Sequence, residues 1–224
     1  MVERVRAAGI EVDAPLLPGH GTSPRALQAL GFDDWLAGAR ASFDRAAERG
    51  PVAVLGFSMG SLLALSLAAE HALPGLVVMG CALRLSAPLR AAFQIAEATR
   101  LRLPDAYLGK PFGPDIRDKT LAAEIGAYDR HPIRAAMEVH RAARIVSARL
   151  GDVRCPVLVQ HGARDRVCSP RAVRDLEAGL GSRDVRVRIY PRSAHMLALD
   201  YDREEVATDV VRFLERVRYA PVEP

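Results

Sequence analysis

The 224-residue sequence predicts an α/β protein with a mostly parallel sheet and helices on both faces. Five short apolar segments have the character of buried strands, because valine, isoleucine and leucine dominate them without strict polar alternation. Helical patterns fall between these segments, and such alternation of strand and helix is typical of parallel sheets. The chain is long enough for one sizeable core and short for two, so one main domain is expected.

The elements of the first third follow this alternation. Residues 1–9 (MVERVRAAG) read as the tail of a helix that Gly9 closes at its C-cap. Residues 9–17 (GIEVDAPLL) are apolar and bounded by turn residues, which predicts a first strand. Helical spacing runs through residues 22–49 in one or two pieces. A strand at 51–57 (PVAVLGF) then leads directly into an apolar helix at 58–73.

The same alternation continues to the end of the chain. Apolar runs bounded by turn residues predict strands at 75–83 (GLVVMGCAL) and 155–162 (CPVLVQHG). A helix is expected at 171–180, followed by a strand at 185–191 (VRVRIYP). The last helical pattern covers residues 204–218.

Residues 84–149 interrupt this rhythm. They contain helical stretches at 88–102 and 133–150, with a loop rich in proline and glycine between them and no convincing strand. The strand pattern resumes afterwards, so the segment is interpreted as a small helical cap insertion. The core then comprises residues 1–83 and 150–224, which form one domain.

Charge and composition exclude several classes of function. The net charge of +4 is modest, and the arginines are interleaved with aspartate and glutamate, so no basic stripe for nucleic acid is expected. The longest apolar region, 62–83, is interrupted by Glu70, His71 and Pro74, which argues against a membrane span.

The cysteines indicate neither a metal site nor a disulfide framework. Cys81, Cys155 and Cys168 form no Cys-x-x-Cys pair and have no histidine at zinc-ligand spacing. The number of cysteines is odd, and the first segment lacks the apolar block of a secretory signal. Both observations favour reduced thiols in the cytoplasm.

The stretch Gly56-Phe57-Ser58-Met59-Gly60 joins an apolar strand to an apolar helix. In a Gly-x-Ser-x-Gly turn of this kind, a strained backbone exposes the serine hydroxyl, and small residues on either side let strand and helix cross closely. The helix N-terminus lies near the serine, so the Met59 amide is a candidate oxyanion donor. The alternative is an ordinary serine in a glycine-flanked connection to a buried helix.

A serine nucleophile needs a base, and the base needs an acid that orients it. Asp165 follows the strand at 155–162 in a glycine-containing turn, and His195 follows the strand at 185–191. Both positions match the order serine, acid, histidine expected after such a turn.

Other acids and histidines fit the roles less well. Asp152 precedes its strand and lies at the wrong end of the sheet, while Asp200 and Asp202 are expected at the start of the last helix, Asp202 as a candidate N-cap. Structural roles are expected for the remaining candidate histidines, His71, His131, His140 and His161.

Four motifs together resemble the α/β-hydrolase superfamily, and they are most similar to its bacterial carboxylesterase and monoacylglycerol lipase branch. They are LPGHGTSP, GFSMGSLLAL, PVLVQHGARDRV and SAHMLALDYDREEV. The resemblance implies a three-layer α/β-hydrolase fold with a nucleophile at Ser58, an acid at Asp165 and a base at His195. It also implies hydrolysis of short- to medium-chain esters or monoacylglycerols, with no cofactor and no metal.

The resemblance further implies an element that the sequence does not contain. Members of the superfamily carry, upstream of the segment RAAGIEVDAPLLPGHG, a buried strand and a short loop whose backbone N–H is the second oxyanion donor. The expectation is therefore that this chain lacks that strand and loop. Two explanations remain open: the sequence starts too late, or the chain is a natural variant. Loss of one oxyanion donor costs on the order of a hundredfold in rate.

Substrate contacts are expected from the insertion and from one loop of the core. Tyr107 and Phe112 are candidate walls of an acyl pocket, and His20 resembles a loop residue near the site. The alternatives are packing within the insertion for the two aromatic residues and a turn role for His20.

Two other functions fit the same residues. The triad could act on a different acyl substrate, such as a thioester or an amide. A non-catalytic member could instead bind an apolar ligand, since fold alone does not determine function.

Overall fold

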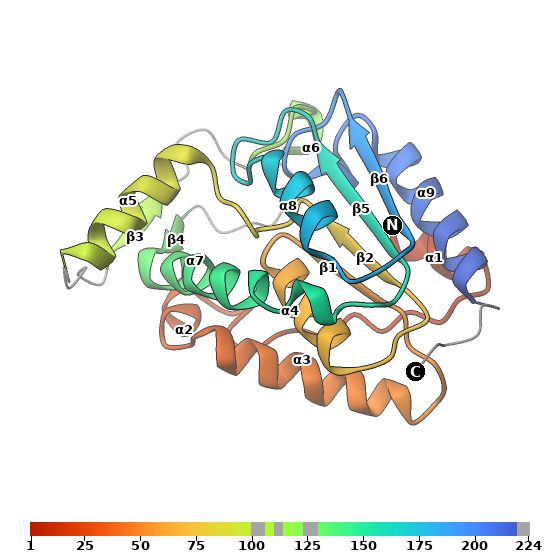
Figure 1. The fold of residues 1–224 in the computed structure, drawn as a ribbon. Helices are drawn as coiled ribbons and strands as arrows, with labels where there is room; N and C mark the ends of the chain where they lie inside the picture. Colours follow the sequence, from red (N-terminus) through yellow and green to blue (C-terminus); the bar gives the residue numbers. More distant parts are fainter. Residues whose placement is uncertain (100–105, 110–113, 123–129, 219–224) are drawn as a thin grey trace.

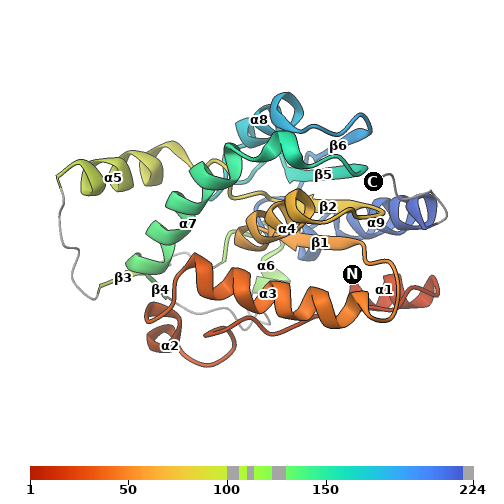
Figure 2. The same cartoon turned by 60° about the horizontal axis from the view of Figure 1, so that its bottom comes forward.

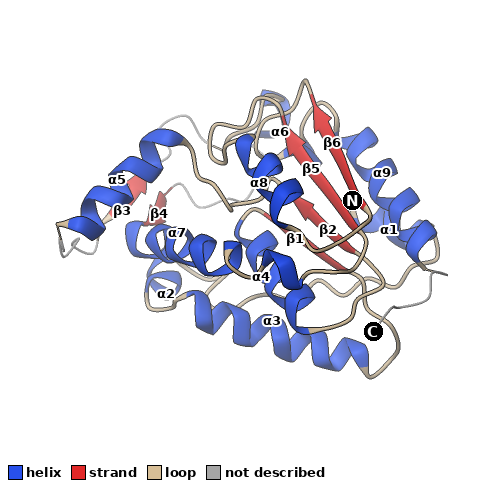
Figure 3. Ribbon diagram, in the orientation of Figure 1, coloured by secondary structure: helices blue, strands red, loops and turns tan. Residues whose placement is uncertain are grey.

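A computed structural model describes residues 1–99, 106–109, 114–122 and 130–218 of the chain. Within these ranges the main sheet has four parallel strands in the order β1-β2-β5-β6 (Figure 3). The strands are β1 (Val54–Phe57), β2 (Leu76–Met79), β5 (Val157–Gly162) and β6 (Val185–Tyr190). The parallel sheet predicted from the apolar segments is confirmed, although the strands are shorter than most of those segments.

The sheet lies between two apolar layers, as expected when successive side chains of a strand point to opposite faces. Leu76 and Val78 of β2 pack into one core, while Val77 and Met79 pack into the other. The first core is covered by α3 (Phe32–Ala47), α4 (Met59–Glu70), α7 (Ile133–Ser147) and α8 (Arg171–Gly179). The second is covered by α1 (Val2–Ala7) and α9 (Arg203–Val217) (Figures 1 and 2). The prediction of helices on both faces is confirmed.

The helices agree with the sequence pattern over most of the core. Residues 22–49 form two pieces, α2 (Pro24–Gln28) and α3, and Gly9 follows α1 with a left-handed backbone, φ +72°. Ser23 caps α2, since its hydroxyl accepts a hydrogen bond from the Ala26 N–H at 3.2 Å. The remaining short helices are α6 (Lys119–Ala122) and the 3-10 turns η1 (Leu150–Asp152) and η2 (Leu197–Leu199).

The strand predicted at residues 9–17 is wrong. The structure has no ladder at these residues, and Leu16 is 73% exposed. Ile10 and Val12 nevertheless pack against the second core. The apolar residues of this segment therefore reflect its contact with one face of the core. An irregular segment can make such a contact without pairing with a strand.

The insertion contains the expected helical stretches and one strand pair that the sequence did not indicate. Its helices are α5 (Ala87–Ala98), α6 and α7, and part of the stretch predicted at 88–102 lies outside the described residues. The strands β3 (Tyr107–Gly109) and β4 (Arg130–Pro132) pair antiparallel. Three-residue strands are too short to give a periodic signal, so the prediction of no strand here was wrong.

A search of the described residues for a helix both long and apolar enough to cross a membrane finds none.

His140 is buried where α7 packs against α5. Its ring centroid lies 5.8 Å from that of Phe93, and its Nε2 is among the buried side-chain atoms without a hydrogen-bond partner. Burial lowers the pKa of His140, and the positive charges of Arg144 and Arg90 lower it further against the opposing effect of Glu97. The folded protein therefore disfavours protonation of this imidazole.

This burial predicts a pH dependence of stability. Below about pH 6.5 the unfolded imidazole binds a proton that the folded one resists, so the free energy of unfolding decreases as the pH falls. His140→Phe keeps a ring in the same place and removes this contribution. Urea unfolding near neutral pH and again about two units lower is expected to show a smaller loss of stability for His140→Phe than for the wild type. An equal loss in both proteins would contradict the assignment.

Candidate active site

The turn between β1 and α4 holds Ser58 in a strained backbone conformation. Ser58 has φ 53° and ψ −120°, and it is the one non-glycine residue with positive φ in the described part of the chain. Such strain costs on the order of 1–3 kcal/mol and persists only where the surroundings fix the conformation. Here the Ser58 N–H donates to the Met79 carbonyl at 2.9 Å, and the Ser58 carbonyl accepts from the Ser61 N–H at 3.0 Å.

Close contact between strand and helix explains Gly56 but not Gly60. A Cβ atom on Gly56 would lie 2.3 Å from the Gly60 carbonyl oxygen and 2.7 Å from the Ser61 Cα. A Cβ atom on Gly60 would meet nothing within 4 Å. The expectation that the residues on either side must be small for space therefore agrees with the contacts at Gly56, whereas Gly60 has room for a methyl group.

Ser58, His195 and Asp165 lie in a continuous line of hydrogen bonds. The Ser58 Oγ is 2.9 Å from His195 Nε2, and His195 Nδ1 is 2.8 Å from Asp165 Oδ2. An ionised carboxylate only accepts hydrogen bonds, so Nδ1 carries the proton and Nε2 is free to accept from the serine hydroxyl. The three residues follow β1, β6 and β5, and parallel strands place their carboxyl ends at one edge of the sheet.

The carboxylate of Asp165 is held from two sides. Its Oδ1 accepts the backbone N–H groups of Val167 and Cys168, each at 2.8 Å. His161 Nε2 lies 3.3 Å from the Cys168 carbonyl oxygen and 3.4 Å from Asp165 Oδ2. Burial lowers the pKa of His161 despite the nearby carboxylate, so protonation of this imidazole is disfavoured. The structural role expected for His161 is consistent with these contacts.

The N-terminus of α4 faces the same site. Met59 is the first residue of that helix and directly follows Ser58. The first N–H groups of a helix have no acceptor within the helix and carry the positive end of its dipole. The Met59 N–H is therefore available, in chemical terms, to an anion that forms beside Ser58.

One group of side chains beside Ser58 has the composition of a metal site. Ligand atoms of Asp165, Cys168 and His195 lie within 4.8 Å of one another. Burial raises the pKa of the Cys168 thiol well above its ordinary value, which disfavours the thiolate that a metal requires. The Asp165 and His195 atoms also hydrogen-bond each other, so the geometry favours a proton between them over a metal.

Of the three predicted substrate-binding residues, the structure describes the surroundings of His20 and Tyr107. His20 Nδ1 lies 3.2 Å from the Pro18 carbonyl oxygen, and its ring packs edge-on to Trp35 at 5.9 Å. Tyr107 lies half-buried on β3, beside an open hollow that Arg25 and Arg134 also line. Phe112 lies outside the described residues, and substrate binding by all three remains a prediction.

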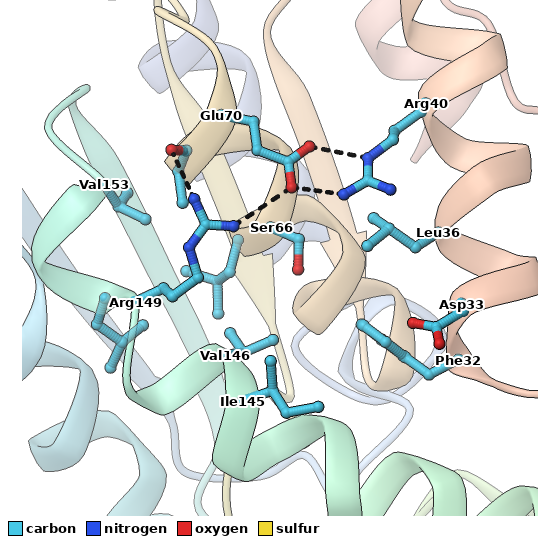
Figure 4. A pocket seen from close by; sticks show the side chains of 13 residues that line it. Phe32, Asp33, Leu36, Arg40, Ser66, Glu70, Ile145, Val146, Arg149 and Val153 are labelled. Atoms are coloured by element: carbon cyan, nitrogen blue, oxygen red, sulfur yellow. Dashed lines mark hydrogen bonds and ion pairs between the residues drawn. The ribbon is translucent and has the colours of Figure 1, made fainter.

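A hollow of about 200 Å³ lies away from the triad, between α3, α4 and α7 (Figure 4). Glu70 lies at the edge of this hollow. Its carboxylate accepts hydrogen bonds from Arg40 at 2.7 and 2.9 Å and from Arg149 at 3.4 Å. Glu70 ends the helix that begins after Ser58, and a helix of this length spans about 18 Å. These contacts link α3 and α4 to the turn after α7, so this feature is structural and distinct from the line of Ser58, His195 and Asp165.

Two acidic residues beside this line were not predicted as part of the site. Asp115, in the insertion, accepts a hydrogen bond from the backbone N–H of His195 at 3.3 Å. Asp200, expected at the start of the last helix, accepts one from the Ala194 N–H at 2.8 Å. Asp200 follows His195 closely in the sequence, and this closeness could have indicated a contact between the two loops. Nothing in the sequence around Asp115 indicated its contact with His195.

Comparisons with known proteins place the chain in a family. A family model described as serine aminopeptidase, S33, matches residues 1–202. A thermostable monoacylglycerol lipase of Bacillus sp. (strain H-257) is 26% identical over 96% of this chain and 84% of its own length. A carboxylesterase of Bacillus subtilis (strain 168) is 21% identical over 93% of this chain and 82% of its own length.

Solved structures show the same likeness. A structure described for LipS and LipT, two metagenome-derived lipolytic enzymes, matches with a TM-score of 0.85 and 28% identity, over 96% of this chain and 86% of the other. The monoacylglycerol lipase of Paleococcus ferrophilus matches with a TM-score of 0.81 and 20% identity, over 96% and 87% of the two chains.

Proposed function

Because this chain belongs to the serine aminopeptidase S33 family and has the α/β-hydrolase fold, we propose that it is a carboxylic ester hydrolase. The observation that carries the proposal is the hydrogen-bonded line from Ser58 through His195 to Asp165 at the carboxyl edge of the sheet. The lipolytic and esterase relatives support esters as the substrate class.

In the proposed reaction, Ser58 is the nucleophile of an acyl transfer. Its Oγ attacks the ester carbonyl carbon while His195 Nε2 takes the hydroxyl proton, and Asp165 keeps the imidazole in the required tautomer. A positioned base of this kind contributes roughly 10²–10⁴-fold to the rate. The Met59 N–H donates to the oxyanion of the tetrahedral intermediate.

The intermediate then collapses by loss of the alcohol. The C–O bond to the leaving group breaks, and His195 returns its proton to the departing oxygen, which leaves an acyl ester on Ser58. Water attacks this ester with His195 again acting as base, and the carboxylic acid is released. The reaction needs no redox step and no further co-reactant.

The substrate range and the setting are further parts of the proposal. Short- to medium-chain acyl esters and monoacylglycerols are the proposed substrates, supported by the relatives named monoacylglycerol lipase and carboxylesterase. Residues 84–149 are proposed as a cap over the site, supported by the helices α5 and α7. A cytoplasmic setting is proposed on the basis of three free cysteines.

A comparison of leaving groups tests the reaction class. Initial rates are measured on nitrophenyl esters of increasing acyl length, on a monoacylglycerol, on an acyl thioester and on an aminoacyl nitroanilide. The proposal predicts that oxygen esters have the highest kcat/KM and that the anilide is the poorest substrate. Faster turnover of the anilide or the thioester would contradict ester hydrolysis, and ligand binding without any turnover would favour a non-catalytic role.

A further inference from the structure

The segment Pro114–Asp118, here called the strap, lies against the two loops that carry Asp165 and His195. The strap belongs to the insertion between β2 and β5, whereas these loops follow β5 and β6. The Asp115 carbonyl accepts a hydrogen bond from the Met196 N–H at 3.1 Å. The strap therefore reaches the residue that follows His195 through its backbone as well as through its side chains.

The Asp115 carboxylate bridges the two loops directly. Its Oδ2 accepts the backbone N–H of Arg166 at 2.9 Å and that of His195 at 3.3 Å. Its Oδ1 accepts the Arg166 Nε–H at 2.9 Å. One oxygen atom thus joins the residue after Asp165 to His195 itself, and the side chain of Asp115 is only 9% exposed.

The Asp200 carboxylate ties the strap to the residue before His195. It is fully buried and accepts four backbone N–H groups at 2.8–2.9 Å, from Arg117, Asp118, Ala194 and Tyr201. Two of these donors belong to the strap and one to the histidine loop. Hydrogen bonds to an ionised acceptor are stronger than neutral ones, so these contacts fix the loop firmly.

The two loops have few other links near the reacting atoms. The ladder between β5 and β6 ends at Gly162 and Tyr190. Beyond it, the Ala163 N–H donates to the Tyr190 carbonyl at 2.9 Å, and Arg164 donates through its N–H to the Ser193 carbonyl at 3.0 Å and through its Nε to the Pro191 carbonyl at 3.5 Å. Asp115 supplies the next bridge along both loops, at Arg166 and His195, closer to the Asp165–His195 hydrogen bond.

We propose that Asp115 and Asp200 are positioning residues, which set the separation of Asp165 and His195 by holding both catalytic loops to the strap. This inference rests on the proposed function, because it gives His195 and Asp165 their catalytic roles. A displacement of about 1 Å in a catalytic group can cost on the order of 10²-fold in rate. Loss of either carboxylate is therefore expected to displace His195 and so to lower kcat, although neither carboxylate contacts the substrate.

The test compares Asp115→Asn and Asp115→Ala with two controls. Asp175→Asn removes a carboxylate on α8 that pairs with the Arg84 side chain at 2.5 Å and lies outside the hydrogen bonds of Asp115 and Asp200. Arg166→Ala removes the guanidinium that pairs with Asp115 but keeps the backbone N–H that Asp115 bridges. Asp200→Asn is the second positioning variant. Each protein is assayed for kcat and KM on one nitrophenyl ester, and its folded fraction is measured by circular dichroism.

The expected result is a fall in kcat of roughly 10- to 100-fold for the Asp115 and Asp200 variants, with KM within about twofold of the wild type. Asp175→Asn is expected to keep the wild-type kcat, and Arg166→Ala is expected to lose less kcat than the Asp115 variants because the backbone N–H bridge remains. In proton NMR spectra, the far-downfield resonance of the His195 Nδ1–H, bonded to Asp165, is expected to shift or broaden in the positioning variants only. The pH profile of kcat/KM is expected to move with it, because the base loses its fixed partner.

Two results would overturn the inference. One is a loss of kcat no larger than that of Asp175→Asn once the folded fraction is taken into account. The other is an unchanged His195 Nδ1–H resonance in Asp115→Ala, which would show that the strap does not set the position of His195. Failure of the proposed function would be seen differently, as a wild-type protein that does not hydrolyse esters. In that case the NMR comparison of wild type and variants would still test whether the strap positions His195.

Discussion

Replacing Ser58 by alanine is expected to lower kcat for ester hydrolysis by on the order of 10⁴-fold or more. No acyl-enzyme can form without the Ser58 hydroxyl, so only the oxyanion donor and substrate binding would remain to accelerate attack by water. The fold is expected to persist, because the Ser58 backbone contacts with Met79 and Ser61 do not involve the side chain. The measurement is the initial rate on a nitrophenyl ester at a concentration of folded protein set by circular dichroism.

Ser66 offers a matched control in α4, the helix that follows Ser58. Its hydroxyl is buried and donates to the Leu62 carbonyl at 2.9 Å within α4, so it contributes to the helix and not to the triad. Ser66→Ala is expected to keep kcat within about twofold of the wild type. Retention of more than about one hundredth of the activity by Ser58→Ala would exclude Ser58 as the nucleophile.

Replacing Gly56 by alanine is expected to disrupt both stability and activity. The added methyl group would lie 2.3 Å from the Gly60 carbonyl oxygen and 2.7 Å from the Ser61 Cα, and neither backbone atom can move without shifting the start of α4. Overpacking of this kind costs about 1–3 kcal/mol or more. A shift of α4 would also displace Ser58 and Met59, so kcat is expected to fall together with the free energy of unfolding measured in urea.

Gly60→Ala is the matched control for this substitution. Its methyl group would meet nothing within 4 Å, and alanine is favoured over glycine in a helix by roughly 1 kcal/mol. Gly60→Ala is therefore expected to keep activity and to be as stable as the wild type or more so. Equal destabilisation by the two substitutions would contradict the close strand-to-helix crossing at Gly56.

Local patterns in the sequence were sufficient to predict three side chains that the structure brings together. The Gly-x-Ser-x-Gly turn lies between an apolar strand and an apolar helix, and this context located Ser58. Asp165 and His195 were predicted because parallel strands bring their carboxyl ends to one edge, whatever the length of chain between them. In the structure these side chains lie within hydrogen-bond distance, while their catalytic roles remain predictions.

Features that depend on the path of irregular segments could not be predicted in this way. The contact of Asp115 with His195 joins residues 80 positions apart through a loop that has no periodicity. Residues 9–17 show strand-like composition, but composition does not reveal whether a neighbouring strand is available for pairing. The second oxyanion donor, which the resemblance implies upstream of the segment RAAGIEVDAPLLPGHG, remains a prediction.

Reaction with a fluorophosphonate, followed by mass spectrometry of the digested protein, tests the central claim most directly. These reagents phosphonylate a serine that is activated by a neighbouring base, so they report nucleophilicity independently of the natural substrate. The account predicts one adduct on the peptide that contains Ser58, and no adduct on that peptide in His195→Ala or in the unfolded protein. A folded wild-type protein that forms no adduct, or that is modified at another serine, would contradict it.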